Sequence, residues 1–275
     1  MSDILRLALK EFRDGLRNRW VAATIALLAT LSLLLVAIGQ SPSGGVAADP
    51  LALTVVSLSS LSVYLLPLIA LLLAHDAFAG ELERGTLLLL LSYPVARWQI
   101  VLGKLLGHLS ILTLAIFAGF GAAALAHVLG GETGRAGWLA FAALCASSVL
   151  LGAVFIAVGY ALSAAVDERA KAAGLAIALW LLFVVLYDLA LLGILLADER
   201  QALGQELFAA ALLLNPTDAF RIFNLTLIED VRGAAGLAGL AAERFAAAPA
   251  ALVSLAAWIF APLGLSLMLF SRREL

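Results

Sequence analysis

A group of charged side chains stands between two long apolar segments. It comprises Asp76, Glu81, Glu83 and Arg84, and Gly85, one threonine and five consecutive leucines follow. The leucine run is too short to cross a membrane, which takes about 20 apolar residues. Charged residues beside a short apolar run predict a small helix at the membrane surface, although an ordinary amphipathic connector has the same pattern. Segment 75–99 is therefore the first candidate functional site.

Two further groups are acidic. Asp167, Glu168 and Arg169 form a short charged run between two apolar segments. Asp188 lies inside an apolar segment, about 12 Å from its end at 1.5 Å per residue. An ionised residue at such depth indicates a functional site by default. The structural alternative is a carboxyl that is protonated or reaches the nearby interface.

A last polar group comprises Asn215, Pro216, Asp218 and Arg221. Asn215 is a good N-cap, and Pro216 suits the first position of a helix. We therefore expect segment 198–248 to form short helices that lie on the outer surface. They either cap their own helix bundle or provide a docking surface for a partner, and an exposed apolar patch would distinguish the two.

Several classes of function lack their sequence signals. The single cysteine, Cys145, and three widely separated histidines predict no metal site. A net charge of −2 argues against a nucleic-acid partner. The sequence has no GxxxxGK[ST] phosphate loop, so any ATP and Mg²⁺ would be bound by another subunit. We expect no catalytic residue, no enzyme activity and no cofactor in this chain.

The elements that must position these residues are membrane spans. Of 275 residues, 64% are hydrophobic and 13% are charged, about half the charged share of a typical soluble domain. Six apolar segments predict an all-α membrane protein, embedded in lipid, with a single transmembrane domain over residues 1–275. The predicted transmembrane helices are 20–39, 51–74, 100–128, 138–163, 172–197 and 249–271.

The distribution of lysine and arginine orients these spans. With the N-terminus in the cytoplasm, the cytoplasmic segments hold twelve of the seventeen basic residues, and the first outer loop holds none. The positive-inside rule therefore predicts that both termini are cytoplasmic. Residues 1–19 have charges on one face and Leu5, Leu9, Phe12 and Leu16 on another, which predicts an amphipathic helix along the membrane surface before the first span.

A resemblance to a known family adds to this interpretation. The pattern Glu81-x-x-Arg84-Gly85-Thr86, followed by an apolar run, Pro94, Arg97 and Gly103-Lys104, resembles the signature loop of exporter-type ABC permeases. The resemblance implies an elbow helix at 1–19 and a homodimer bound to cytoplasmic ATPase subunits. By carry-over, residues 76–84 would be a coupling helix with Glu81, Glu83 and Arg84 in polar contact with the ATPase, and Asp167, Glu168 and Arg169 would make a second contact.

The pattern Asn215-Pro216-x-Asp218-x-x-Arg221 is similar to a narrower group, the permeases that support maturation of nitrous oxide reductase. That resemblance implies the bacterial inner membrane, a role in assembling a copper–sulfur centre during denitrification, and a periplasmic β-helical partner at this loop. Alternatives are an exporter of a drug, lipid or ion, and a non-transporting scaffold for a periplasmic assembly protein. A secondary transporter would place more polar groups at mid-membrane, and the cargo, whether a sulfur species, copper or none, cannot be read from the residues.

Overall fold

The computed structural model describes residues 3–39, 50–131, 134–197, 205–226 and 247–273, and all regular elements within them are helices. Six helical segments are long and apolar enough to cross a membrane, which confirms the predicted number of spans. The first three are formed by α2 (Arg19–Gly39), α3 (Pro50–Ala74) and α6 (Arg97–Gly130). The other three are formed by α7 (Arg135–Ala165), by α8 (Arg169–Leu181) with its continuation, and by α13 (Ala247–Arg272).

Helix α7 is the centre of the bundle. It packs against α3 and α13, and 72% of its most apolar stretch is buried, against 17% for α8 and for α13. Small residues allow this close packing. A methyl group at Gly159 would lie 2.7 Å from Ala74 Cβ, and one at Gly152 would lie 2.1 Å from a methyl of Leu112.

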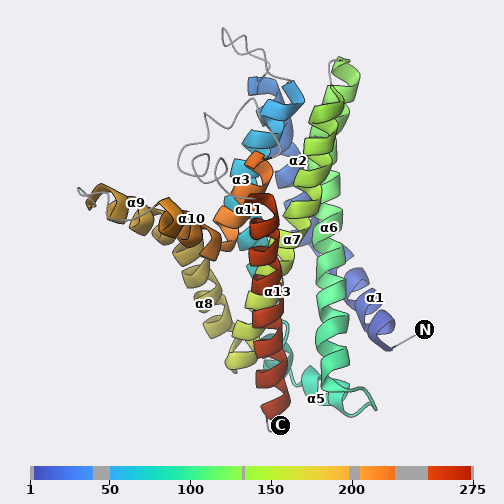
Figure 1. The fold of residues 1–275 in the computed structure, drawn as a ribbon. Helices are drawn as coiled ribbons and strands as arrows, with labels where there is room; N and C mark the ends of the chain where they lie inside the picture. The colour runs from blue at the N-terminus through green and yellow to red at the C-terminus, as the bar shows by residue number, and fades with distance from the viewer. Residues whose placement is uncertain (1–2, 40–49, 132–133, 198–204, 227–246, 274–275) are drawn as a thin grey trace.

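Shorter helices gather at one end of the bundle. Between α3 and α6 lie α4 (Ala79–Glu83) and α5 (Thr86–Leu91), and α5 lies at the same end as the C-terminal end of α13 (Figure 1). The N-terminal helix α1 (Asp3–Leu16) packs along the half of α6 nearest to α5. We call this the α5 end of the bundle.

The fifth span is interrupted. Helix α8 continues through a single π-helical turn, η1 (Leu182–Leu186), into α9 (Tyr187–Ala197). Helices α9 and α10 (Gln205–Leu214) extend away from the bundle on one side, and α11 (Pro216–Thr226) returns to it (Figure 1). Short helices were predicted in this segment, and most residues of α11 are buried against α13, α7 and α3, so α11 follows the alternative of a cap that packs on its own bundle.

Candidate functional site

The segment between α3 and α6 forms a helical hairpin. Helix α4 ends at Glu83, Gly85 adopts a left-handed conformation with φ of 71°, and α5 begins at Thr86. Glycine adopts this conformation without the steric cost that a Cβ atom would bring. Gly85 therefore lets the chain turn sharply between the two helices.

Residues from the ends of α7 and α13 hold the start of α4. Phe78 cannot cap the helix with its own side chain, and the Ser163 hydroxyl of α7 instead accepts hydrogen bonds from the backbone N–H groups of Phe78 and Ala79, both at 3.0 Å. The Phe78 ring is buried, with ring centroids 5.3 Å from Tyr160 and 4.8 Å from Phe270. The start of α4 is thus fixed to two spans.

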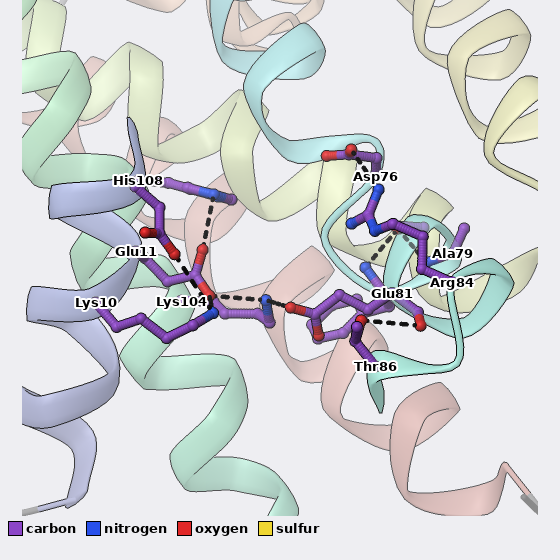
Figure 2. Close-up of polar contacts among 12 residues, drawn as sticks. Lys10, Glu11, Asp76, Ala79, Glu81, Arg84, Thr86, Lys104 and His108 are labelled. Atoms are coloured by element: carbon purple, nitrogen blue, oxygen red, sulfur yellow. Dashed lines mark hydrogen bonds and ion pairs between the residues drawn. The ribbon is translucent and has the colours of Figure 1, made fainter. Parts of the chain in front are cut away.

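Lys104 of α6 holds the other side of α4 (Figure 2). Its side chain is only 2% exposed, and its Nζ lies 2.7 Å from Glu81 Oε1 and 3.0 Å from Glu11 Oε1. Glu81 belongs to α4 and Glu11 to α1. A lysine is almost never fully buried unless it is paired, and here one ammonium group joins three helices.

The Glu11 carboxylate extends this cluster. Its Oε2 lies 3.9 Å from His108 Nε2, and His108 Nδ1 lies 2.8 Å from the Tyr160 hydroxyl. Burial would raise the pKa of the Glu11 carboxyl, but Lys104, His108 and Lys10 lower that pKa by more, so it lies below its ordinary value near 4.5. Glu11 is therefore ionised at neutral pH and pairs with Lys104 as a charge.

The turn between α7 and α8 contacts the same hairpin. Asp76 Oδ2 lies 3.7 Å from Arg84 Nη1 and 3.5 Å from Arg169 Nε. The backbone N–H of Arg169 donates to Glu83 Oε2 at 3.1 Å. These partly exposed contacts join the two predicted cytoplasmic loops to each other.

The C-terminal end of α13 is tied in by two arginines. Arg97, the first residue of α6, donates to the carbonyl oxygens of Phe270, Ser271 and Arg273 at 2.7–2.9 Å. Arg273 pairs with Asp167 at 2.6 Å. Groups from α6, α7 and α8 thus contact the hairpin directly, and α1 and the end of α13 are joined to α6 beside it.

The outer side of the hairpin is apolar and exposed. The side chains of Leu88 and Leu89 in α5 are 54% and 67% exposed, and Tyr93 just after it is 67% exposed. Leu87 of the same run is buried. The hairpin therefore has a polar side fixed to the bundle and an apolar side that no other described residue covers.

A second polar cluster lies where α11 meets the interrupted fifth span. Asn215 caps α11, because its Oδ1 accepts from the backbone N–H of Thr217 at 3.1 Å, and Pro216 is the first helical residue, which confirms both predictions. The Asn215 Nδ2 group donates to the carbonyl of Phe183 in η1 at 2.9 Å. In a π-helical turn the hydrogen bonds run from i to i+5, and Asn215 supplies the Phe183 carbonyl with a donor from another segment.

Arg221 joins the two carboxylates of this second cluster. Its Nη1 lies 3.4 Å from Asp188 Oδ2 and 3.2 Å from Asp218 Oδ1. Asp218 is fully buried and also accepts from Asn215 Nδ2 at 3.0 Å. Asp188 of α9 and three of the four residues predicted at the last loop therefore form one cluster, although they were predicted as two separate sites.

Comparison with known proteins identifies the class of protein to which this arrangement belongs. The family described as ABC-2 family transporter protein matches residues 5–275. The chain is 46% identical over 276 residues to a protein of Stutzerimonas stutzeri named probable ABC transporter permease protein NosY, covering 99% of both chains. It is 47% identical over 277 residues to the protein of the same name in Pseudomonas aeruginosa, covering both chains completely. The chain belongs to the ABC-2 transporter family.

This ABC-2 chain is the membrane-spanning permease subunit of an ABC transporter, a multi-pass membrane protein, as the resemblance implied. Such a permease works with an ATPase partner. The hairpin of α4 and α5 lies between the second and third spans, within segment 75–99. Among the described residues, no three His, Cys, Asp or Glu side chains lie close enough to hold a metal ion.

The structure changes the roles of several predicted residues of the permease. Glu81 faces Lys104 inside the bundle and not a partner, because its side chain is only 13% exposed. Asn215, Pro216 and Asp218 were predicted to contact a periplasmic partner, but all three are buried within the chain. That prediction is wrong for these three residues in this arrangement, because they pack α11 into the bundle, whereas Arg221 is partly exposed.

Lys104, Glu11, His108, Tyr160 and Ser163 were not among the predicted site residues. Lys104 was counted as a cytoplasmic charge, yet it lies two turns inside α6. A charged residue within an apolar span marks a function by default, and applying that rule to Lys104 as it was applied to Asp188 would have found this site. The pairing partners could not be inferred, since they lie far away in the sequence.

Proposed function

We propose that this permease acts as a homodimer with two cytoplasmic ATPase subunits and couples ATP hydrolysis to transport or conformational work across the bacterial inner membrane. ATP and Mg²⁺ would bind to the ATPase subunits. The hairpin of α4 and α5 receives the movement of those subunits, and the α7–α8 turn, with Asp167, Glu168 and Arg169, makes a second contact. Both termini face the cytoplasm in this proposal, and α1 is the elbow helix.

One observation carries the proposal. The α4–α5 hairpin is fixed on its inner side by groups from α6, α7 and α8, while Leu88, Leu89 and Tyr93 on its outer side stay exposed. Exposed apolar side chains grouped beside charged ones are typical of a protein interaction site. A rigidly mounted, exposed hairpin is also what a mechanical contact needs, because a push on it must move the spans.

The contact can be tested with the permease and its ATPase subunit purified together. Replacing Leu88 and Leu89 with aspartate should weaken assembly by about tenfold or more, because central apolar contacts dominate protein interfaces. Leu129→Asp is the matched control, since Leu129 is 79% exposed at the opposite end of α6. Unchanged binding of the double variant, measured by titration in detergent or nanodiscs, would contradict docking at α5.

The proposed dimer contact and the proposed contact with a periplasmic β-helical partner involve other surfaces. The fifth span buries little within the chain, and α9 has no buried residue, which supports a second copy on this side. Helix α10 exposes Leu207 and Leu214, which supports a partner there in place of the buried Asn215, Pro216 and Asp218. Cross-linking between cysteines placed on α9 of two copies would test the dimer.

We further propose that the work supports assembly of the copper–sulfur centre of nitrous oxide reductase. The support is the similarity over the full length to the two NosY permeases. Deleting the gene should yield a reductase that lacks the optical absorption of its copper–sulfur centre, and a plasmid copy should restore it. A fully assembled reductase in the deletion strain would favour the alternative of an exporter for a drug, lipid or ion.

A further inference from the structure

The backbones of α1 and α6 approach each other closely at two glycines of α6. A methyl group at Gly103 would lie 2.6 Å from Leu7 Cβ, and one at Gly107 would lie 2.5 Å from Glu11 Cβ. Two glycines four residues apart form a groove that lets two helices approach closely. The leucines on the opposite side of α1, Leu5 and Leu16 among them, stay exposed. Helix α1 is therefore carried by α6, and its apolar stripe faces away from the bundle.

Lys104 lies between the two glycines of this groove and reaches both α1 and α4. Its ammonium group lies 3.0 Å from Glu11 of α1 and 2.7 Å from Glu81 of α4. Among the described residues it is the one group with ion pairs to both helices. A displacement of α4 must therefore either break a buried ion pair or move the Lys104 and Glu11 side chains with it.

The pairing is not built simply for stability. Burying an ion pair costs desolvation that its attraction often fails to recover, so apolar residues of similar size commonly stabilise as well or better. In addition, Glu81 Oε2 is buried and accepts no hydrogen bond from any described residue. A buried acceptor without a partner costs free energy. Breaking one ion pair, on the other hand, leaves an uncompensated buried charge and is strongly unfavourable, so the cluster resists separation of α1 from α4.

We propose that Lys104 is a positioning residue that makes α1 and α4 move as one unit, so that a push on the coupling hairpin is transmitted to the helix that precedes the first span. The proposal rests on the proposed function, because it assumes that an ATPase moves the hairpin. It adds a second output for that movement. Besides the spans that hold α4, helix α1 responds to nucleotide.

Distances between spin labels in the complex with the ATPase subunit test this proposal. After Cys145 is replaced by alanine, one label pair sits at Asp14→Cys in α1 and Thr86→Cys in α5, two exposed positions. A second sample carries Thr86→Cys alone, so that in the proposed homodimer the labels of the two copies report the movement of one hairpin relative to the other. Both samples are measured by electron–electron double resonance in nanodiscs, with and without trapped nucleotide.

With Lys104 present, nucleotide should change the Thr86–Thr86 distance between the two copies and leave the Asp14–Thr86 distance constant. In Lys104→Met, the Asp14–Thr86 distribution should broaden and shift with nucleotide. Lys10→Met is the matched control, because Lys10 also lies 3.5 Å from Glu11 but its side chain is 58% exposed. This control should behave as the unaltered chain does, since exposed pairs contribute little.

The outcomes separate the two proposals. An Asp14–Thr86 distance that stays narrow and constant in Lys104→Met, while the Thr86–Thr86 distance between the two copies still responds, overturns the role of Lys104 alone. A Thr86–Thr86 distance that ignores nucleotide in the unaltered complex overturns the coupling function and this role with it. If Lys104→Met does not fold, the triple variant Glu11→Gln, Lys104→Met and Glu81→Gln removes all three charges at similar volume. It should also lose the coordinated movement, and retained coordination overturns the proposal.

Discussion

Two clusters in this permease have the same charge pattern, one cation between two carboxylates, but they differ in the length and burial of their ion pairs. At the α5 end, Lys104 lies between Glu11 and Glu81; near the interrupted fifth span, Arg221 lies between Asp188 and Asp218. The Lys104 pairs are 2.7–3.0 Å long with the cation 2% exposed, whereas the Arg221 pairs are 3.2–3.4 Å long with the cation 24% exposed. Lys104 is buried and joins three helices, so it makes a stiff connection. Arg221 is partly exposed, so it makes a looser connection in which water can replace the ion pairs.

The largest difference should appear when each cation is replaced by methionine. Lys104→Met leaves two carboxylates without their buried partner, which should lower the free energy of unfolding by about 3–5 kcal/mol. Arg221→Met should cost only about 1–2 kcal/mol, because Asp218 keeps its hydrogen bond from Asn215. Thermal unfolding of both variants in nanodiscs measures the gap. Equal losses would mean that the two clusters do not differ in stiffness.

A smaller effect should come from the glycine groove that supports the Lys104 cluster. Gly107→Ala places a methyl group 2.5 Å from Glu11 Cβ, and such overpacking should destabilise the chain by about 1–3 kcal/mol. Gly121→Ala in the same helix is the control, since no atom lies within 4 Å of the added methyl group. That control should stabilise α6 by about 0.5–1 kcal/mol. Opposite signs in the two melting temperatures are expected, and a neutral Gly107→Ala would show that α1 is loosely seated.

At the other cluster, the cap of α11 should contribute about as much as an ordinary helix cap. Asn215→Ala removes the acceptor for the Thr217 N–H and the donor to the Phe183 carbonyl, which should cost about 1 kcal/mol. Asn215→Ser is the comparison, since its hydroxyl can still accept from the Thr217 N–H while the amide donor is lost. Hydrogen exchange at the first turn of α11 measures both variants. Equal protection in Asn215→Ala and the unaltered chain would contradict the cap.

The smallest expected effect is a pH dependence of stability at the Lys104 cluster. The pKa of Glu11 is lowered in the folded chain, so its contribution to stability is present above its ordinary pKa near 4.5 and is lost as pH falls through the folded value. The stability gap between the unaltered chain and Glu11→Gln should stay constant from about pH 7 to pH 5 and shrink below that. A gap that widens towards acid pH would contradict an ionised Glu11.

The six spans were predictable because an apolar run of about 20 residues is typical of a transmembrane helix. The cap at Asn215 and Pro216 was predictable for a similar reason, since both residues act on their immediate neighbours. The direction of Glu81 was not, because its partner Lys104 comes from another helix. The burial of α11 was not predictable either, because Arg221 of this helix pairs with Asp188, which lies in another helix.

Helix α1 shows a second limit of reasoning from sequence. Its most regular apolar stripe includes Leu5, Leu9 and Leu16, and these side chains are exposed. The face against α6 instead includes Leu7, Glu11 and Gly15. In a membrane protein lipid competes with the interior for apolar residues, so hydrophobicity alone does not say which side of a surface helix meets the protein.

The cap that Ser163 supplies to α4 has a practical consequence. Helix α4 has five residues, and the N–H groups of its first residue, Ala79, and of the preceding Phe78 donate to a hydroxyl that belongs to α7. Isolated helices of fewer than about 12 residues are marginal in water, so α4 depends on the bundle for its helical conformation. If the proposed function is right, a synthetic peptide of residues 76–91 should compete poorly for the ATPase subunit, and an inhibitor of the contact would need a stapled hairpin or a helical scaffold that replaces Ser163.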